Sequence, residues 1–322
     1  MKHLNTYITE YIIKKKLNNH ISPYKYCPQN INELIDIVSD KVKNMSNDKR
    51  IDLSDIDVSK ITSLNNMLPL ALKKIKYYDK INYIDVWGWD VKNIEDMSNT
   101  FAYELVHKID GLDSWNVLNV KNMQSMFQYN SFFNGEGIEN WDVSNVKDMS
   151  NMFYNCWSFD GKSIKNWNVS NVKDMSNMFY GCVNFDGDLS KWNTNNITSL
   201  QGTFQFCEQF KGNGLENWDV SNVINMNSLF YRCNNLTCDL SNWKVDKVKK
   251  MNKMFYECYN INFNLSKWNV SKVTNMAFMF NGCKNMECNG IDTWNPNTKT
   301  SRSTLEMFNN TKISNFSSWY KE

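Results

Sequence analysis

The segment WDVSNVKDMSNMFYNC (residues 141–156) recurs almost unchanged as WNVSNVKDMSNMFYGC (residues 167–182), 26 residues further along the chain. The tryptophan that opens it returns ten times at intervals of 25 or 26 residues, at Trp89, Trp115, Trp141, Trp167, Trp192, Trp218, Trp243, Trp268, Trp294 and Trp319. A fixed period of this length marks an array of stacked units, because one unit alone cannot bury its apolar face. The sequence therefore predicts a repeat solenoid.

Other residue types also recur at fixed distances from the tryptophan in each repeat. Positions −3, +2 and +5 from each Trp are usually aliphatic, +8 is usually Met and +12 is Phe in eight repeats. Position +15 is Cys in six consecutive repeats: Cys156, Cys182, Cys207, Cys233, Cys258 and Cys283. We predict that each position forms a ladder in one continuous core. The tryptophans are assigned to that core and not to a carbohydrate platform, because apolar residues flank them at −3 and +2.

Each repeat is expected to hold two short elements. Alternation near the Trp, as at 189–193, predicts a short strand that pairs in parallel with its neighbours at about 4.8 Å. Apolar residues three and four apart over 171–179 predict a short helix or 3₁₀ turn. Phe-Asp-Gly at 159–161 and 185–187 is the expected return turn. The solenoid should span residues 51–322, with degenerate terminal repeats.

Residues 1–50 follow a different pattern and predict two amphipathic helices. One apolar face is formed by Leu4, Tyr7, Ile8, Tyr11 and Ile12, and the other by Ile31, Leu34, Ile35, Val38, Val42 and Met45. Asn30 and Glu33 are placed as a capping box for the second helix. We expect an N-terminal cap; the alternative is a docking module for a partner. The basic run at 14–16 fits a solvated helix end, with membrane-surface contact as its alternative.

The 141–156 motif, repeated between Phe-x-Gly and Leu-Ser-x-Trp segments over about residues 51–319, resembles the BspA-type leucine-rich repeat surface proteins. It is most similar to their mycoplasma and Bacteroides branch, a domain of unknown function, and the opening residues 1–10 are similar to members from gut Bacteroidales and their phages. The resemblance implies a right-handed solenoid of leucine-rich-repeat type that binds or adheres. It implies no catalytic residues.

Charge and hydropathy exclude several classes of function. The formal net charge of +2 gives no basic field for nucleic acid, and no stretch approaches 18 consecutive apolar residues, so no membrane span is expected. Glu10 and the 14–16 lysines interrupt any signal-peptide core. We therefore expect a cytoplasmic or virion-associated protein, with surface display left open. Nine cysteines, an odd number, fit a reducing compartment.

The sequence predicts neither an enzyme nor a cofactor or metal. Cysteines one whole repeat apart lack metal-ligand spacing, and Cys238 and Cys288, outside the ladder, are the ones expected nearer the surface. The acidic turn at 186–188 is assigned to turn chemistry and not to calcium. His3, His20 and His107 are the histidines, and none lies in a regular repeat. An enzyme would require His107 to meet carboxylates in a pocket.

Alternation turns the neighbours of each Trp away from the core, which makes them the candidate ligand-binding residues. They are Asp142, Asn168, Lys191, Asn193, Asn217, Asp219, Asn242, Lys244, Lys267 and Asn269. Together they would tile the strand face that solenoids commonly use for ligands; the alternative is a row that is simply solvated. The first hypothesis is a non-catalytic protein that binds a protein or glycan through this face. The second is a structural component of a phage particle or other assembly, docked through the N-terminal helices.

Overall fold

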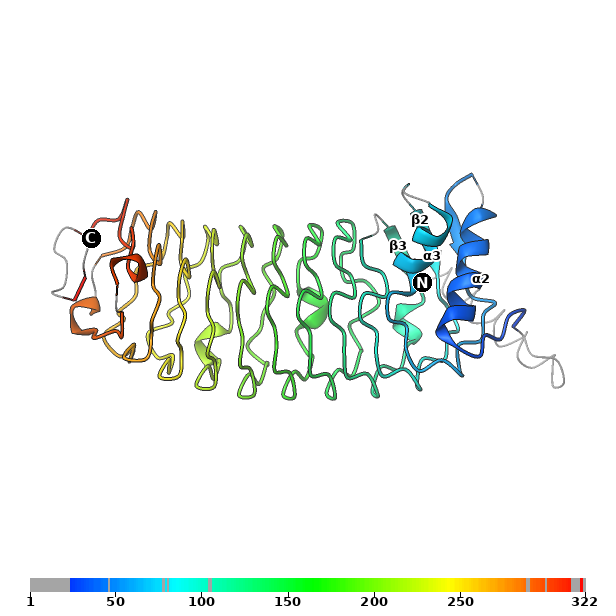
Figure 1. Ribbon diagram of the computed structural model, residues 1–322, viewed down its shortest axis with the longest axis horizontal. Helices are drawn as coiled ribbons and strands as arrows, with labels where there is room; N and C mark the ends of the chain where they lie inside the picture. The colour runs from blue at the N-terminus through cyan, green and yellow to red at the C-terminus, as the bar shows by residue number, and fades with distance from the viewer. Residues whose placement is uncertain are drawn as a thin grey trace.

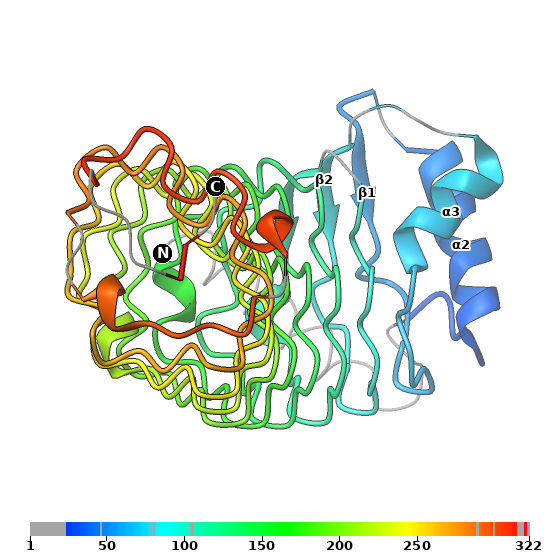
Figure 2. The ribbon, with the colours of Figure 1, turned by 60° about the vertical axis from the view of Figure 1, so that its left-hand side comes forward.

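The computed structural model describes residues 24–45, 47–76, 79, 81–103, 106–287, 290–298, 300–313 and 319–320. Successive repeats lie side by side along one long axis, with the helices gathered at the N-terminal end (Figure 1). Turned toward the C-terminal end, the coils overlap in one closed outline, so the repeats share a common cross-section (Figure 2). None of the helices in the described part of the chain is long and apolar enough to cross a bilayer.

Two α-helices cover the N-terminal end of the stack. Helix α2 (Ile31–Lys43) begins at the predicted cap, where the side chain of Asn30 accepts from the Glu33 N–H at 3.1 Å. Its apolar face, with Leu34, Val38 and Val42, is buried in the core, which confirms this helix. The helix expected from the Leu4–Ile12 pattern lies outside the described residues.

Helix α3 (Met67–Ile75), which the sequence reading missed, packs against α2. It lies in the 33 residues between Ile56, which replaces the Trp in the first degenerate repeat, and Trp89. This interval is longer than the 25- or 26-residue period, and the extra chain folds as the helix. Met67, Leu68, Ala71 and Leu72 form its buried face.

One parallel sheet adjoins these helices. It consists of β1 (Arg50–Asp52), β2 (Ile81–Asp85) and β3 (Val106–Asp110), in the order β1-β2-β3. Ile51, Ile84 and Ile109 are aligned across it and are buried. Among the described residues, regular strands are confined to this sheet.

The strand predicted around each Trp is therefore wrong. Each tryptophan N–H instead closes a tight turn within its own repeat, as in the 3.1 Å bond from Trp192 N to Leu189 O. In four repeats the residues before Trp form short 3₁₀ helices, which are η1 (Leu112–Ser114), η2 (Lys162–Ile164), η3 (Leu215–Asn217) and η4 (Ile291–Thr293). A further one, η5 (Ser301–Ser303), lies near the C-terminal end. An N–H used inside the repeat cannot pair with the neighbouring repeat, so no strand ladder forms here.

The segment from +8 to +14 joins neighbouring repeats. Of the short helix or 3₁₀ turn predicted there, the helix is wrong, whereas turns closed three residues back are present. Every second N–H points along the stack, with Met149 N to Asp174 O at 3.1 Å and Phe153 N to Met178 O at 2.9 Å. The intervening N–H groups close turns three residues back, as in Met152 N to Met149 O at 3.2 Å. The apolar spacing of three and four therefore reflects a run of turns and not a helix.

The tryptophans form a ladder inside the stack, as predicted. The rings of Trp89 and Trp115 stack at 6.0 Å with an interplanar angle of 3°, and those of Trp141 and Trp167 stack at 6.3 Å. Each indole N–H also needs an acceptor once it is buried. Trp141 Nε1 donates to the carbonyl of Leu112, at position −3 of the preceding repeat, at 2.9 Å. The same bond recurs for Trp167, Trp192, Trp218, Trp243, Trp268 and Trp294.

Replacing Trp167 by Ala should lower the free energy of unfolding by about 3–5 kcal/mol, because it leaves a cavity and removes the indole hydrogen bond to the Ile138 carbonyl, which then keeps only the Trp141 N–H at 3.3 Å. Trp167→Phe should have a smaller effect, since a phenyl ring fills part of the space but donates no hydrogen bond. Chemical denaturation followed by circular dichroism measures both. A Trp167→Ala protein that unfolds at the wild-type midpoint would contradict the ladder.

Candidate binding surface

All ten residues predicted from their position beside Trp are exposed. They project from successive repeats on either side of the buried indole ladder. Two lysines in this group reach across to the preceding repeat. Lys191 Nζ lies 2.7 Å from Asn166 Oδ1, and Lys267 Nζ lies 2.8 Å from Asn242 Oδ1. The flanking residues therefore form aligned rows on the surface, although no sheet lies beneath them.

The residue directly after Trp also holds the local turn. Asp142 Oδ1 accepts from Ser144 N at 3.0 Å, and Asp219 Oδ1 accepts from Ser221 N at 2.9 Å. This Asx turn explains why short polar side chains with an acceptor prevail at +1. Hydrogen bonds from Ser221, with the nearby Lys244 and Lys247 adding a smaller effect, lower the pKa of Asp219. The row is thus structural as well as accessible.

Asparagines at +4 bridge successive repeats. Asn145 Nδ2 donates to Leu118 O at 2.8 Å, and Asn171 Nδ2 donates to Ser144 O at 2.7 Å. The same bond is made by Asn93, Asn119, Asn196 and Asn222. Each amide satisfies a carbonyl that the turns leave unpaired, so much of the asparagine content serves the stack and is not available as a ligand contact.

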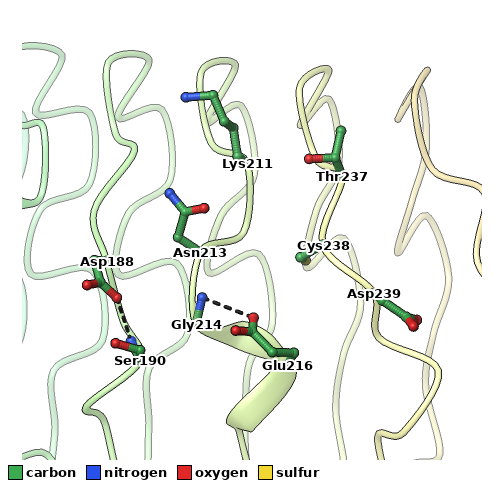
Figure 3. Close-up of a pocket in the computed structure, with 9 residues that line it drawn as sticks. All are labelled: Asp188, Ser190, Lys211, Asn213, Gly214, Glu216, Thr237, Cys238 and Asp239. Carbon is green, nitrogen blue, oxygen red and sulfur yellow. Dashed lines mark hydrogen bonds between the residues drawn. The ribbon is translucent and has the colours of Figure 1, made fainter.

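A hollow of 560 Å³ opens between three neighbouring repeats. It is lined by Asp188, Ser190, Lys211, Asn213, Gly214, Glu216, Thr237, Cys238 and Asp239 (Figure 3). Its carboxylates have protein partners: Asp188 pairs with Lys165 at 2.7 Å, and Glu216 Oε2 accepts from Gly214 N at 3.1 Å. The ion pair between Asp186 and Lys211 lies at its rim. These pairings support the assignment of the 186–188 turn to turn chemistry.

The described residues assemble neither a metal site nor a pocket around the candidate acid–base residue His107. No group of three or more His, Cys, Asp or Glu side chains there could hold a metal ion. His107 is exposed, and its ring stacks on Phe132 with 3.8 Å between centroids. It lines neither the hollow near Cys238 nor the smaller one between α2 and α3. His3 and His20 lie outside the described residues.

The cysteine ladder lies in the core, as predicted. Each of its six thiols is fully buried, unpaired with another sulfur, and donates to the carbonyl of the Phe one repeat earlier, as in Cys182 Sγ to Phe153 O at 3.0 Å. Burial raises the pKa of the Cys182 thiol far above its ordinary value. Cys238 is partly exposed, and burial raises its pKa to about 12. Cys288 lies outside the described residues.

A row of surface aromatic rings, which the sequence reading missed, runs along the +13 and +14 positions. It consists of Tyr103, Tyr129, Tyr154, Tyr180, Phe206, Tyr231 and Tyr256, and we call it the aromatic row. Adjacent centroids lie 4.2–5.4 Å apart. Tyr103 is 59% exposed and Tyr129 is 40% exposed. The signal was present in the sequence, because each of these seven repeats has one aromatic residue at +13 or +14, but it follows no single phase.

Three members of the aromatic row adopt left-handed backbone conformations. Tyr103, Tyr129 and Phe206 stand at +14 with φ of 65°, 64° and 63°. Asn155 and Gly181 occupy the same position in other repeats, with φ of 57° and 70°. Gly and Asn adopt this conformation readily, whereas it costs other residues roughly 1–2 kcal/mol. An aromatic residue at +14 therefore costs stability that Asn or Gly would not.

The stacked repeats, which display long rows of side chains at matching positions, define a repeat protein. The chain belongs to the family described as "Mycoplasma protein of unknown function, DUF285", whose model matches residues 37–134, 71–162, 104–217 and 198–319. No curated protein and no solved structure matches the chain.

In the native protein the six ladder cysteines should resist maleimide, because buried neutral thiols are not nucleophiles. Cys27, which is exposed, should react within minutes, and Cys238 more slowly. Mass spectrometry of peptides after quenching measures each site, with guanidinium-unfolded protein as the positive control. Rapid native labelling of Cys182 would contradict the buried ladder.

Proposed function

We propose that this chain is a non-catalytic binding protein. Its stacked repeats form a solenoid related to the BspA-type leucine-rich repeat proteins, and it recognises a protein or a glycan through the residues that flank the tryptophans. The proposal rests on one observation above all: the flanking residues are exposed in every central repeat, while the tryptophan between them is buried. Like side chains thus lie in line over the length of the stack, and such a surface suits an extended partner.

The charges along this surface support an extended and not a point-like contact. Asp142 and Asp219 contribute negative charge, whereas Lys191, Lys244 and Lys267 contribute positive charge. Repeats with Asn at these positions separate them. In the repeats that the structure describes, similar residues are distributed along a line and unlike residues do not converge on a point, which supports a non-catalytic function.

The alternative, a structural component docked through its N-terminal helices, draws less support from the described residues. The apolar face of α2 is buried against α3 and the first repeats, so this helix offers no apolar docking face. It caps the stack. The cap interpretation therefore favours the binding hypothesis.

Reversing three flanking charges, by Lys191→Glu, Asp219→Lys and Lys244→Glu together, should weaken capture of the natural partner at least about tenfold, since mismatched charges at an interface oppose binding. The measurement is pull-down from the source organism, followed by titration of the partner identified. The fold should persist, because all three side chains are exposed.

The matched control carries Glu95→Lys, Lys147→Glu and Lys173→Glu, which change the net charge equally at position +6. These side chains are also exposed or nearly so, but they lie in a different row. Equal capture by both triple variants and the wild type would exclude the flanking surface. If the wild type itself captures nothing, the binding function is wrong.

A further inference from the structure

We infer that the five rings from Tyr103 to Phe206 in the aromatic row, with their surroundings, form a binding site for a neutral polysaccharide. The inference rests on the proposed function, in that the chain binds a ligand, but it names a different surface and one class of ligand. The site extends over five repeats, through residues 98–103, 124–129, 150–155, 176–181 and 201–206. We call these segments the aromatic band.

The first argument is continuity. Where +13 is not aromatic, as at Ala102, Gln128 and Gln205, the neighbouring +14 residue supplies the ring. The row consequently passes through every repeat from Tyr103 to Tyr256 without a gap. A core ladder tolerates no such alternation, because a shift by one position would expose the ring. A surface row tolerates it as long as each repeat presents a ring.

The second argument is conformational strain. Tyr103, Tyr129 and Phe206 hold left-handed conformations at a position where Asn155 and Gly181 adopt them readily. Arg232 and Glu257 are also left-handed at this position, so the conformation belongs to the repeat, and the aromatic residues add the cost of a bulky side chain to it. Tyr103 and Tyr129 are exposed, and the rings along the row do not all stack face to face. Phe206 stands at 79° to Tyr180 and 66° to Tyr231, and Tyr129 is tilted 59° from Tyr154.

The third argument is the absence of charge. Of all the residues of the chain 22% are charged, yet the aromatic band contains none. Its polar groups are amides and hydroxyls, among them Gln124, Gln128 and Gln201. Burial and a hydrogen bond with Tyr180 raise the pKa of Tyr154, which keeps its phenol neutral. Charged groups lie at the borders of the band and have protein partners there: Asp148 accepts from Ser150 N at 2.9 Å, and Arg232, whose guanidinium lies 5.8 Å from the centroid of the Phe206 ring, pairs with Glu257 at 2.6 Å.

These features together select a polysaccharide. One ring per repeat along a straight row matches a ligand that is itself a linear array of similar units. Aromatic faces pack against the C–H faces of sugar rings, and the exposed rings of Tyr103 and Tyr129 can make this contact, whereas Tyr154 and Tyr180 cover each other's faces at 4.2 Å and offer their edges. Neutral amides and hydroxyls exchange hydrogen bonds with sugar hydroxyls. An anionic polymer would need cations that the aromatic band lacks. A protein partner would favour exposed aliphatic anchors in pockets, and the exposed side chains of the aromatic band include none.

The test replaces the three strained rings by the residue that Asn155 already shows to fit, as Tyr103→Asn, Tyr129→Asn and Phe206→Asn in one full-length variant. Native gels containing hydroxyethyl cellulose, dextran or glucomannan measure binding as retarded migration. We expect at least one of them to retard the wild type, with little change on adding salt, since the band carries no charge. The triple variant should bind at least about tenfold more weakly and still melt cooperatively.

The control replaces three exposed apolar side chains outside the band, as Leu118→Asn, Ile224→Asn and Leu305→Asn, and should bind like the wild type. Should the aromatic triple variant not fold, Tyr129→Asn alone should show a smaller but measurable loss. The proposal would be overturned if none of the three polysaccharides retarded the wild type. It would also be overturned if the ring variants were retarded as much as the wild type.

Further outcomes separate this inference from the proposed function. In one of them, the wild type binds a protein that the ring variant no longer binds, while no polysaccharide retards the wild type. That outcome overturns the inference of a polysaccharide ligand and leaves the proposed binding function intact. Retardation abolished by Lys191→Glu, Asp219→Lys and Lys244→Glu, but not by the ring variant, moves the site to the tryptophan flanks and also overturns the inference.

Discussion

The structure depends on how the backbone N–H groups are shared between bonds to the neighbouring repeat and bonds within their own repeat. In the segment from +8 to +14, alternate N–H groups point along the stack and back into their own turn, as at Phe153 and Met152. About half of the N–H groups in this segment therefore bond to the neighbouring repeat, and the others bond within their own repeat. The left-handed residues at +10 and +14, such as Asn151 and Asn155, accompany this alternation in repeat after repeat. Asn side chains at +4 then bond carbonyls that the turns leave unpaired, whereas the Trp indoles and the Cys thiols add a second hydrogen bond to carbonyls that already close a turn.

The core and the helix α2 were predictable from the sequence, whereas the secondary structure inside the repeats was not. Trp167, Met175, Phe179 and Cys182 each hold a fixed phase, and apolarity at a fixed phase means burial whatever the backbone does. Strand and helix were inferred from spacings of two, three and four residues. Those spacings also arise in consecutive turns, and nothing in the side chains reveals which N–H groups face the neighbouring repeat.

Of the two candidate surfaces, one was predicted from the sequence and the other was not. The exposure of the residues beside Trp was predicted from alternation and agrees with the structure, although Asx turns and not strands produce it. The aromatic row escaped prediction because its members change between two positions, as Tyr154 and Phe206 illustrate. Only the stacking of repeats shows that both positions deliver a ring to the same line.

One ring per repeat has an evolutionary consequence. Duplication or loss of a single 25- or 26-residue unit would lengthen or shorten the aromatic row by one ring and leave every other contact in register. Valency, and with it avidity for a polymeric ligand, would then change in discrete steps without redesign of any individual contact. The number of repeats that the gene encodes would then set the length of polymer that the row can contact.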